Sequence, residues 1–397
     1  MKIVVFHQYY VEPDLSGSTR MYHFVKRMVQ AGHQVTVITG GAIRREMSTK
    51  LIVRTQSQNG AELISIADGY AQNKGFYGRL FSFFRYLCVA TFIGLKYSGG
   101  DRIIASSTPL TVGVPALLVS KFRKVPLIFE VRDLWPDAPV ALGYLKSRYL
   151  ISLAHWFEKL VYAKSQSIVA LSNGIQKKIA KRTDTPVHFI PNGVDSDYLE
   201  QQPVMETNSS SKIQFIYAGS CGFNNGMDTL SDFIIKAFDD PVLRECINVT
   251  IIGDGLGLEP HKNKIANKAN LLGKLPKEEV VDRLFKADVG LYPQVKLNNN
   301  DLKKDSLPNK FFDYLGSGLC FLAAVDIEGE AAGIINENNL GRVCVSEDVE
   351  SMLLAARFFV ENRNELEGCK MASTRVREKY LRSDHADQFL KLIELDN

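Results

Sequence analysis

The stretch that decides the fold begins with KIVVF (residues 2–6), a short apolar run with β-branched residues that is typical of a buried strand. It is followed by TRMYHFVKRMVQAG (19–32), whose apolar residues recur at helical spacing, and then by a second apolar run, QVTVITG (34–40). Strands that are apolar on both faces belong to parallel sheets, because crossover helices cover both sides. We therefore predict an α/β fold with a parallel sheet between two helical layers.

The same alternation of strands and helices continues through the rest of the chain. Further strand-like segments are AELISIA, RIIAS, PLIFEV, SIVAL and VHFIP, and after residue 210 IQFIYAG, NVTIIG, NLLG, VGLYP and CFLAAV. Between these two series, EQQPVMETNSSSK (200–212) is polar and lacks periodicity, as linkers do. We predict two doubly wound domains, 1–199 and 213–375, with 200–212 as the linker and a helix at about 376–397 that packs back on the first domain.

The composition is that of a globular chain with unevenly distributed charge. Its 397 residues suit two domains, and six scattered cysteines without a Cys-x-x-Cys pair indicate neither a disulfide framework nor a metal site. We expect no signal peptide and no transmembrane helix, hence a cytoplasmic protein. Residues 1–200 hold 25 Lys/Arg and 14 Asp/Glu, a net charge of +11, whereas residues 201–397 hold 23 and 30, a net charge of −7. The basic half indicates an anionic partner, with drift in surface composition as the alternative.

The segment DSLPNKFFDYLGSG (305–318) combines a helix start with charged residues. Pro308 suits a first helical turn, where free N–H groups and the helix dipole favour an anion, and Lys310 adds a positive charge. Asp313 is placed to accept hydrogen bonds from a ribose diol, and Asp305 from a second sugar. The constellation fits a diphosphate with a sugar at each end. The alternative is a capped helix with a surface Lys310–Asp313 pair.

A second candidate loop, EPDLSGSTR (12–20), follows the first strand. Ligands of doubly wound sheets sit at the carboxyl ends of strands. Gly17 permits a close approach of the backbone to a phosphate, and Ser18 and Arg20 are hydrogen-bond donors. The alternative is a turn at Gly17 followed by a helix cap at Ser18 or Thr19.

The order of several motifs resembles a known family. IPNGVD, YAGSCGFNNGMDTL, IIGDG, LLGKLP and LPNKFFDYLGSG follow one another as in the family 4 retaining glycosyltransferases, which have the GT-B fold of two Rossmann-like domains facing across a cleft. Together with EPDLSGSTR, VRDLWPDAPV (131–140) resembles the bacterial N-acetyl-L-fucosamine transferases of O-antigen and capsule assembly. The resemblance covers nearly the whole chain.

This resemblance implies roles for individual residues. Asp305 and Asp313 occupy the places of the family's two glutamates, eight positions apart, which contact the donor sugar and the nucleotide ribose. Ser220 and Asn225 stand where the family commonly has Arg and Lys, so Lys310, Arg20 and backbone amides are expected to hold the diphosphate instead. The implied catalytic residues are Asp305, Lys310, Arg132 and Asp133, and the implied donor-binding residues are Gly17, Ser18, Arg20, Gly219, Gly222, Asn225, Gly253, Lys274, Leu275, Pro308, Asn309 and Asp313.

The resemblance also implies a chemistry that needs neither metal nor cofactor. Helix amides and cationic side chains stabilise the leaving diphosphate, and the acceptor hydroxyl attacks the same face from which UDP leaves. The expected reaction moves N-acetyl-L-fucosamine or another N-acetylated hexosamine from a UDP-sugar to an undecaprenyl-diphosphate-linked sugar. Two alternatives stay open: a UDP-sugar 2-epimerase of the same fold and a catalytically silent membrane scaffold. We expect no nucleic-acid partner.

The segment 73–100 is rich in aromatic and basic residues and contains no acid. Such a composition suits an anionic membrane interface, and SKFRKVP (120–126) could extend it. We therefore predict a peripheral protein on the inner face of the plasma membrane. The alternative is a buried helix with cationic ends. The predicted membrane-contacting residues are Lys74, Phe76, Arg79, Phe83, Phe84 and Arg85.

Overall fold

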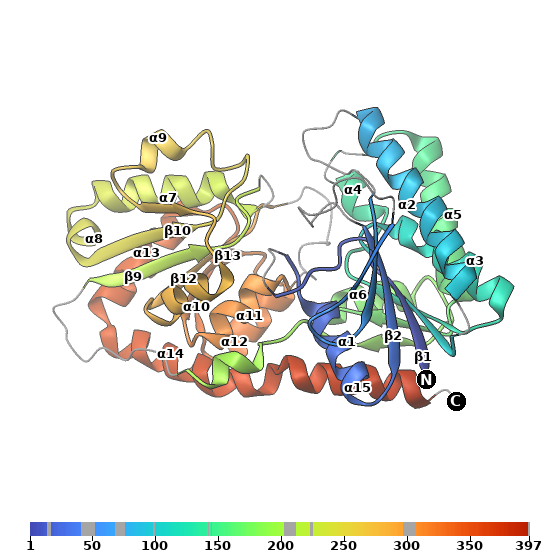
Figure 1. Ribbon diagram of the computed structural model, residues 1–397. Coiled ribbons are helices and arrows are strands. Elements are labelled where there is room, and N and C mark those ends of the chain that lie inside the picture. Colours follow the sequence, from blue (N-terminus) through green and yellow to red (C-terminus); the bar gives the residue numbers. More distant parts are fainter. Residues whose placement is uncertain are drawn as a thin grey trace. The chain divides into compact units, whose positions relative to one another are not determined.

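The computed structural model of the protein contains two compact units, Met1–Pro191 with Ser383–Asn397, and Asn192–Arg382 (Figure 1). The residues that it describes are 1–13, 17–40, 52–67, 76–97, 100–141, 143, 145–201, 212–222, 225–296 and 307–395, without the side chains of 76–83 and 97.

The first unit is built on an eight-stranded sheet with the order β3-β4-β2-β1-β5-β6-β7-β8. All neighbouring strands are parallel except β3, which runs antiparallel to β4 at the edge. The five residues of β5 and of β6 are all buried, as the apolar sequences predict for central strands. The strands are β1 (Lys2–Phe6), β2 (Gln34–Gly40), β3 (Ile52–Gln56), β4 (Glu62–Ile66), β5 (Arg102–Ser106), β6 (Leu127–Val131), β7 (Ser167–Ala170) and β8 (Val187–Phe189).

Helices cover this sheet with apolar stripes. In the first helix, Met21, Phe24, Val25 and Met28 are buried at the i, i+3, i+4, i+7 spacing of one helix face. The helices are α1 (Arg20–Gln30), α2 (Phe76–Tyr97), η1 (Leu110–Val112), α3 (Gly113–Arg123), α4 (Asp137–Ala141), α5 (Arg148–Lys164) and α6 (Asn173–Ala180).

The last helix, α15 (Arg382–Leu395), completes the core of the first unit (Figure 1). The ring of Phe389 stacks on Phe24 of α1 with centroids 4.6 Å apart. Arg102 of β5 donates a hydrogen bond from Nε to the carbonyl of Ile393 at 3.1 Å. The chain end therefore supplies core side chains to the unit that contains its beginning.

The second unit contains a six-stranded, fully parallel sheet with the order β11-β10-β9-β12-β13-β14. Its strands are β9 (Ile213–Ala218), β10 (Ile247–Ile252), β11 (Asn270–Gly273), β12 (Val289–Pro293), β13 (Cys320–Val325) and β14 (Gly341–Val345). Its helices are η2 (Ser196–Leu199), α7 (Met227–Asp239), α8 (Pro241–Cys246), α9 (Lys262–Ile265), α10 (Lys277–Phe285), α11 (Asn309–Gly316), α12 (Glu330–Glu337), α13 (Val349–Glu361), α14 (Arg363–Val376) and η4 (Arg377–Tyr380).

The division between the units falls earlier than the sequence boundary at 199. Residues 192–199 belong to the second unit, where Tyr198 of η2 is buried in the core beside Phe285. The predicted linker 200–212 lies mostly outside the described residues. None of the described helices is long and apolar enough to cross a membrane.

Candidate functional site

Two glycine turns pack against each other at the carboxyl edge of the second sheet. Gly219 follows β9 with φ 147°, and Gly253 follows β10 with φ 136°. A Cβ atom on Gly253 would lie 1.8 Å from the carbonyl oxygen of Gly219, so only glycine permits this approach. The N–H of Gly219 donates to the carbonyl of Ile252 at 2.9 Å. The two predicted donor-binding residues Gly219 and Gly253 are therefore in contact, and their backbones lie close to the protein surface.

The start of α11 combines two sources of positive potential. Pro308 is the N-cap residue, and its side chain makes no capping hydrogen bond. The first turn holds no acid, but it holds Lys310. A cation there opposes the helix dipole, whose positive end lies at the N-terminus. The side-chain carbonyl oxygen of Asn309 is buried there without a hydrogen-bond partner among the described residues.

Lys310 lies against two buried tyrosines at the ends of neighbouring strands. Its ammonium donates to the Tyr217 hydroxyl at 3.1 Å and lies 4.6 Å from the centre of that ring and 5.6 Å from the ring of Tyr292. Tyr217 donates in turn to the carbonyl of Ser220 at 2.7 Å. A Cβ atom on Gly219 would lie 3.9 Å from Cδ of Lys310, so the lysine stem reaches the first glycine turn.

Asp313 lies one turn further along α11. The Tyr198 hydroxyl donates to its carboxylate at 3.1 Å. Burial, followed by the nearby Asp195 carboxylate, raises the pKa of Asp313 to about 6. Asp195 is itself held by Lys277 and Arg382, each at 2.7 Å. Asp313 is therefore only partly ionised in weakly acidic solution.

Four other predicted residues of the second unit lie on loops after its strands: Gly222, Asn225, Lys274 and Leu275. Asn225 donates from Nδ2 to the carbonyl of Ser220 at 2.8 Å and from its backbone to that of Gly222 at 3.0 Å. Lys274 is exposed and Leu275 half-buried directly after β11. Asp305 lies outside the described residues.

In the first unit, Arg20 is fully buried and makes internal contacts. It pairs with Glu130 at 2.8 Å and donates to the carbonyls of Ile190, at 2.6 Å, and Pro191. Although burial acts to raise it, the pKa of Glu130 is lowered by Arg20, Arg132 and a hydrogen bond from Ser106. This geometry gives Arg20 a structural role, so we do not include it among the proposed phosphate contacts.

Of the other predicted residues in this loop, Gly17 is exposed and Ser18 is half-buried. Gly17 is exposed with φ 146°, and a Cβ atom there would lie 2.8 Å from a methyl group of Val11. The Ser18 hydroxyl is buried without a hydrogen-bond partner among the described residues.

Arg132 and Asp133 follow β6 at the carboxyl edge of the first sheet. A guanidinium nitrogen of Arg132 lies 3.5 Å from Nε2 of His7, and Thr108 donates to Asp133 at 3.1 Å. Burial and, next, the Arg132 charge lower the pKa of His7 to about 3, so its imidazole is neutral and accepts from Arg132. Among the described residues, no group of three His, Cys, Asp or Glu side chains could hold a metal ion.

Comparisons with known proteins bear on both units. Residues 17–193 match the family described as Glycosyl transferase 4-like domain. No curated protein matches the sequence significantly. Solved structures match almost the whole chain. The sucrose-phosphate synthase of Thermosynechococcus elongatus has a TM-score of 0.74 at 12% identity, over 99% of this chain and 98% of its own. The chain has the GT-B fold.

Two further GT-B proteins bear on possible ligands. HepE of Anabaena, solved in complex with UDP, has a TM-score of 0.69 at 12% identity and covers 99% of this chain and 100% of its own. WaaG, a glycosyltransferase involved in lipopolysaccharide biosynthesis, has a TM-score of 0.68 at 16% identity, over 98% of this chain and 99% of its own. The predicted fold and the resemblance to a family 4 type of glycosyltransferase are thus confirmed, whereas the resemblance to N-acetyl-L-fucosamine transferases stays a prediction.

Of the predicted membrane-contacting residues of this GT-B chain, only two have described side chains. Phe84 is exposed and Arg85 half-buried on α2. Lys74 lies outside the described residues, as do the side chains of Phe76, Arg79 and Phe83.

Sequence reasoning missed two residues beside the candidate sites. Tyr217 positions Lys310, but in the sequence it is one more aromatic residue of a buried strand. Gln8 follows β1 and is 1% exposed, and both polar atoms of its amide are without a hydrogen-bond partner among the described residues. No spacing or motif marks either residue in advance.

Proposed function

We propose that the protein is a retaining, metal-independent glycosyltransferase. It transfers N-acetyl-L-fucosamine or another N-acetylated hexosamine from a UDP-sugar to an undecaprenyl-diphosphate-linked sugar in O-antigen or capsule synthesis. The UDP complex of HepE and the matched Glycosyl transferase 4-like domain support the donor class and the reaction type.

One observation carries this proposal: the first turn of α11, which lacks acids, holds Lys310 beside two glycine turns. The positive end of the helix dipole and the lysine charge lie at the same helix end, and an anion bound there would be attracted by both. A diphosphate fits because its charge grows as the sugar departs, and preorganised donors then stabilise the transition state more than the ground state.

The other roles follow from position. The ionised carboxylate of Asp313, one turn into α11, accepts hydrogen bonds from the ribose hydroxyls. Asp305, Arg132 and Asp133 contact the transferred sugar. Because Lys310 and the helix start neutralise the leaving group, we expect EDTA to leave the rate unchanged. Loss of activity in EDTA, restored by Mg²⁺, would overturn the metal-independent mechanism.

The acceptor is presented at a membrane. We propose a peripheral location on the inner face of the plasma membrane, supported by the excess of Lys and Arg in residues 1–200 and by the aromatic, acid-free segment 73–100. There a lipid-linked diphosphate would offer its sugar hydroxyl to the donor.

The decisive experiment is to screen UDP-sugars for turnover with a synthetic prenyl-diphosphate-GlcNAc acceptor. We expect one N-acetylated donor to give a glycosylated lipid with retained anomeric configuration. Epimerised UDP-sugar formed without acceptor would favour the 2-epimerase, and absence of UDP binding by calorimetry would favour the scaffold. Either result would overturn the proposal.

A further inference from the structure

Helix α5 has an apolar stripe that no described part of the protein covers. Tyr149, Leu153 and Trp156 fall on one side of the helix, and Tyr149 is 90% and Trp156 59% exposed. The opposite side, with Val161 and Tyr162, is buried against the sheet. A surface helix normally buries its apolar stripe and exposes polar residues. The second stripe of α5 therefore indicates a contact that the described part of the chain does not make.

The neighbouring helices extend this apolar surface. α3 packs against both α2 and α5 (Figure 1). Phe92 of α2 is 67% exposed and Phe122 of α3 68%, and Phe84 and Leu118 of the same two helices are exposed as well. Exposed apolar residues scattered singly are common, but a contiguous group on adjacent helices marks an interaction site.

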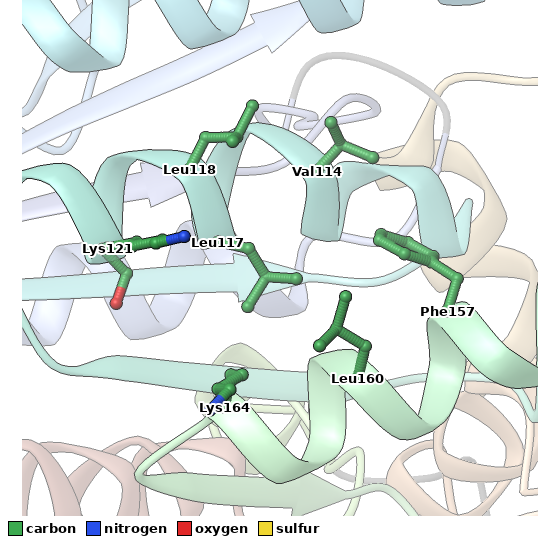
Figure 2. Close-up of a pocket in the computed structure, with 8 residues that line it drawn as sticks. Val114, Leu117, Leu118, Lys121, Phe157, Leu160 and Lys164 are labelled. Atoms are coloured by element: carbon green, nitrogen blue, oxygen red, sulfur yellow. The ribbon is translucent and has the colours of Figure 1, made fainter.

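A groove of about 530 Å³ separates α3 from α5, a volume typical of ligand sites (Figure 2). Its walls are apolar, formed by Val114, Leu117 and Leu118 of α3 and by Phe157 and Leu160 of α5. Figure 2 shows Lys121 and Lys164 toward one end of the groove and Phe157 toward the other. The groove is thus an apolar channel with two cations at one end.

The charges on these helices have almost one sign. α2, α3 and α5 together contain a single acid, Glu158, which is buried and paired with Arg182 at 2.7 Å. Among the described side chains of the three helices and of the residue after α3, the exposed cations are Lys96, Lys121, Arg123, Lys124, Arg148, Lys159 and Lys164. A second copy of the chain would bring like charges together on such a surface, whereas an anionic surface would attract it.

We propose that this α2–α3–α5 face docks on an anionic bilayer and that the groove takes one hydrocarbon chain of a phospholipid, with Lys121 and Lys164 beside its phosphate. Aromatic side chains such as Tyr149 and Trp156 are favoured at the depth of the lipid headgroups. Lysines can bury their apolar stems while the ammonium groups reach the phosphates. The inference rests on the proposed membrane-bound acceptor, and it extends the contact from Phe84 of the predicted segment to residues of α3 and α5.

The first test uses Trp156 as a reporter. The chain has two tryptophans, so Trp135→Phe leaves Trp156 alone. Vesicles of phosphatidylglycerol and phosphatidylcholine with a nitroxide near the headgroup should quench this emission and shift it to the blue. Pure phosphatidylcholine vesicles and inorganic phosphate should not. Bound protein with unquenched Trp156, or a dimer in solution that shields Trp156, would overturn the proposal.

The second test changes the groove cations. Lys121→Gln/Lys164→Gln should weaken binding to the anionic vesicles roughly thirtyfold, given the typical contribution of each lysine near such a surface. The matched control Lys177→Gln/Lys181→Gln removes the same charge from α6 and the residue after it in the same unit, and it should weaken binding several times less than the groove variant because neither lysine lines the groove. Equal losses of affinity in both variants would mean that binding depends only on the net charge of the protein. That result would overturn the assignment of the phosphate to Lys121 and Lys164.

The third test addresses the groove itself. Wild-type protein on vesicles with a diazirine-labelled acyl chain should, after irradiation, carry the label on α3 and α5, and labelling elsewhere would overturn the groove assignment. None of these measurements uses donor or acceptor. Vesicle binding without sugar transfer would therefore overturn the proposed function alone. Transfer to a water-soluble acceptor by a protein that does not bind vesicles would overturn this inference alone.

Discussion

The two units place a cation in the first turn of a helix beside the carboxyl edge of a sheet, but with different partners. Arg20 opens α1 in the first unit and is buried against Glu130 and two backbone carbonyls. Lys310 opens α11 in the second unit and is half-buried against the faces of Tyr217 and Tyr292. Arg20 meets a full negative charge, whereas the contacts of Lys310 include two aromatic rings and a hydroxyl.

The comparison teaches that a cation at a helix start is not by itself a binding site. What distinguishes the two positions is the negative charge that the fold already supplies. Where a buried carboxylate is present, the cation stabilises the core. At the start of α11 the positive end of the helix dipole lies beside the lysine, and we propose that an anionic ligand binds there.

The largest effect that we expect is loss of stability in the Arg20→Met variant. Both side chains of the Arg20–Glu130 pair are fully buried. Removing one partner leaves an uncompensated carboxylate, which costs about 3–5 kcal/mol of the free energy of unfolding. Urea denaturation checks this value. Adding Glu130→Gln should restore part of the loss, and a stability equal to that of the wild type would refute the structural role.

Lys310→Ala should have the converse effect. Its charge is unfavourably placed for the helix dipole, so the free energy of unfolding should change by less than about 1 kcal/mol. UDP affinity should fall roughly 10–100-fold, the range expected for loss of a charge-assisted contact to phosphate. Titration calorimetry measures the affinity. Unchanged UDP affinity would mean that Lys310 does not bind the diphosphate, and the proposed difference in role between Arg20 and Lys310 would be wrong.

The raised pKa of Asp313 predicts two opposite pH dependences. Because its folded pKa of about 6 exceeds the ordinary 3.8, the folded protein binds more protons than the unfolded chain between these values. Asp313 therefore contributes stability at low pH that is lost as the pH rises through 6. UDP binding needs the carboxylate and should weaken about tenfold from pH 7 to pH 5.

The matched control for this prediction is Asp313→Asn, which is similar in shape but does not titrate. In this variant, both the stability and the UDP affinity should depend less on pH. UDP itself titrates in the same way with both proteins, so the difference between the two affinity profiles reports Asp313 alone. Parallel pH profiles of affinity in the two proteins would contradict the ribose contact.

The smallest effect concerns Tyr198→Phe. It removes the hydroxyl that donates to Asp313 at 3.1 Å, and the stability should fall by about 1 kcal/mol. Because this hydrogen bond favours the carboxylate, its loss should raise the pKa of Asp313 further. The acid limb of the UDP affinity profile then moves to higher pH. An unmoved limb would mean that Tyr198 does not tune the carboxyl.

Much of the fold could be predicted from the sequence because strand and helix periods are local properties. The apolar runs at 2–6 and 34–40 are adjacent parallel strands, and the helical stripe between them packs in the core. The antiparallel edge strand β3 was not predicted, because an exposed edge strand has no continuous apolar run. The division at Pro191 was not predicted either, since it depends on Tyr198 joining a core far along the chain.

The candidate site could be predicted in part. The segment 307–318 indicated a helix start with Lys310 and Asp313, and these residues lie there in the structure. From the sequence, similar roles were expected for Arg20 and Lys310 because each is a cation at the start of a helix that follows a strand. Their difference depends on Glu130, 110 positions from Arg20, and on Tyr217, 93 positions from Lys310. No local pattern reports such distant partners.

By itself, the sequence determined the α/β class, the helix start at Pro308 and the excess of cations in residues 1–200, because periodicity, proline chemistry and charge are set residue by residue. Only the tertiary structure decided which cation is neutralised, which carboxyl has a raised pKa and which apolar stripes stay exposed on α2, α3 and α5. These properties depend on burial and on partners that folding brings together from distant parts of the chain, and electrostatic interactions strengthen steeply when water is excluded.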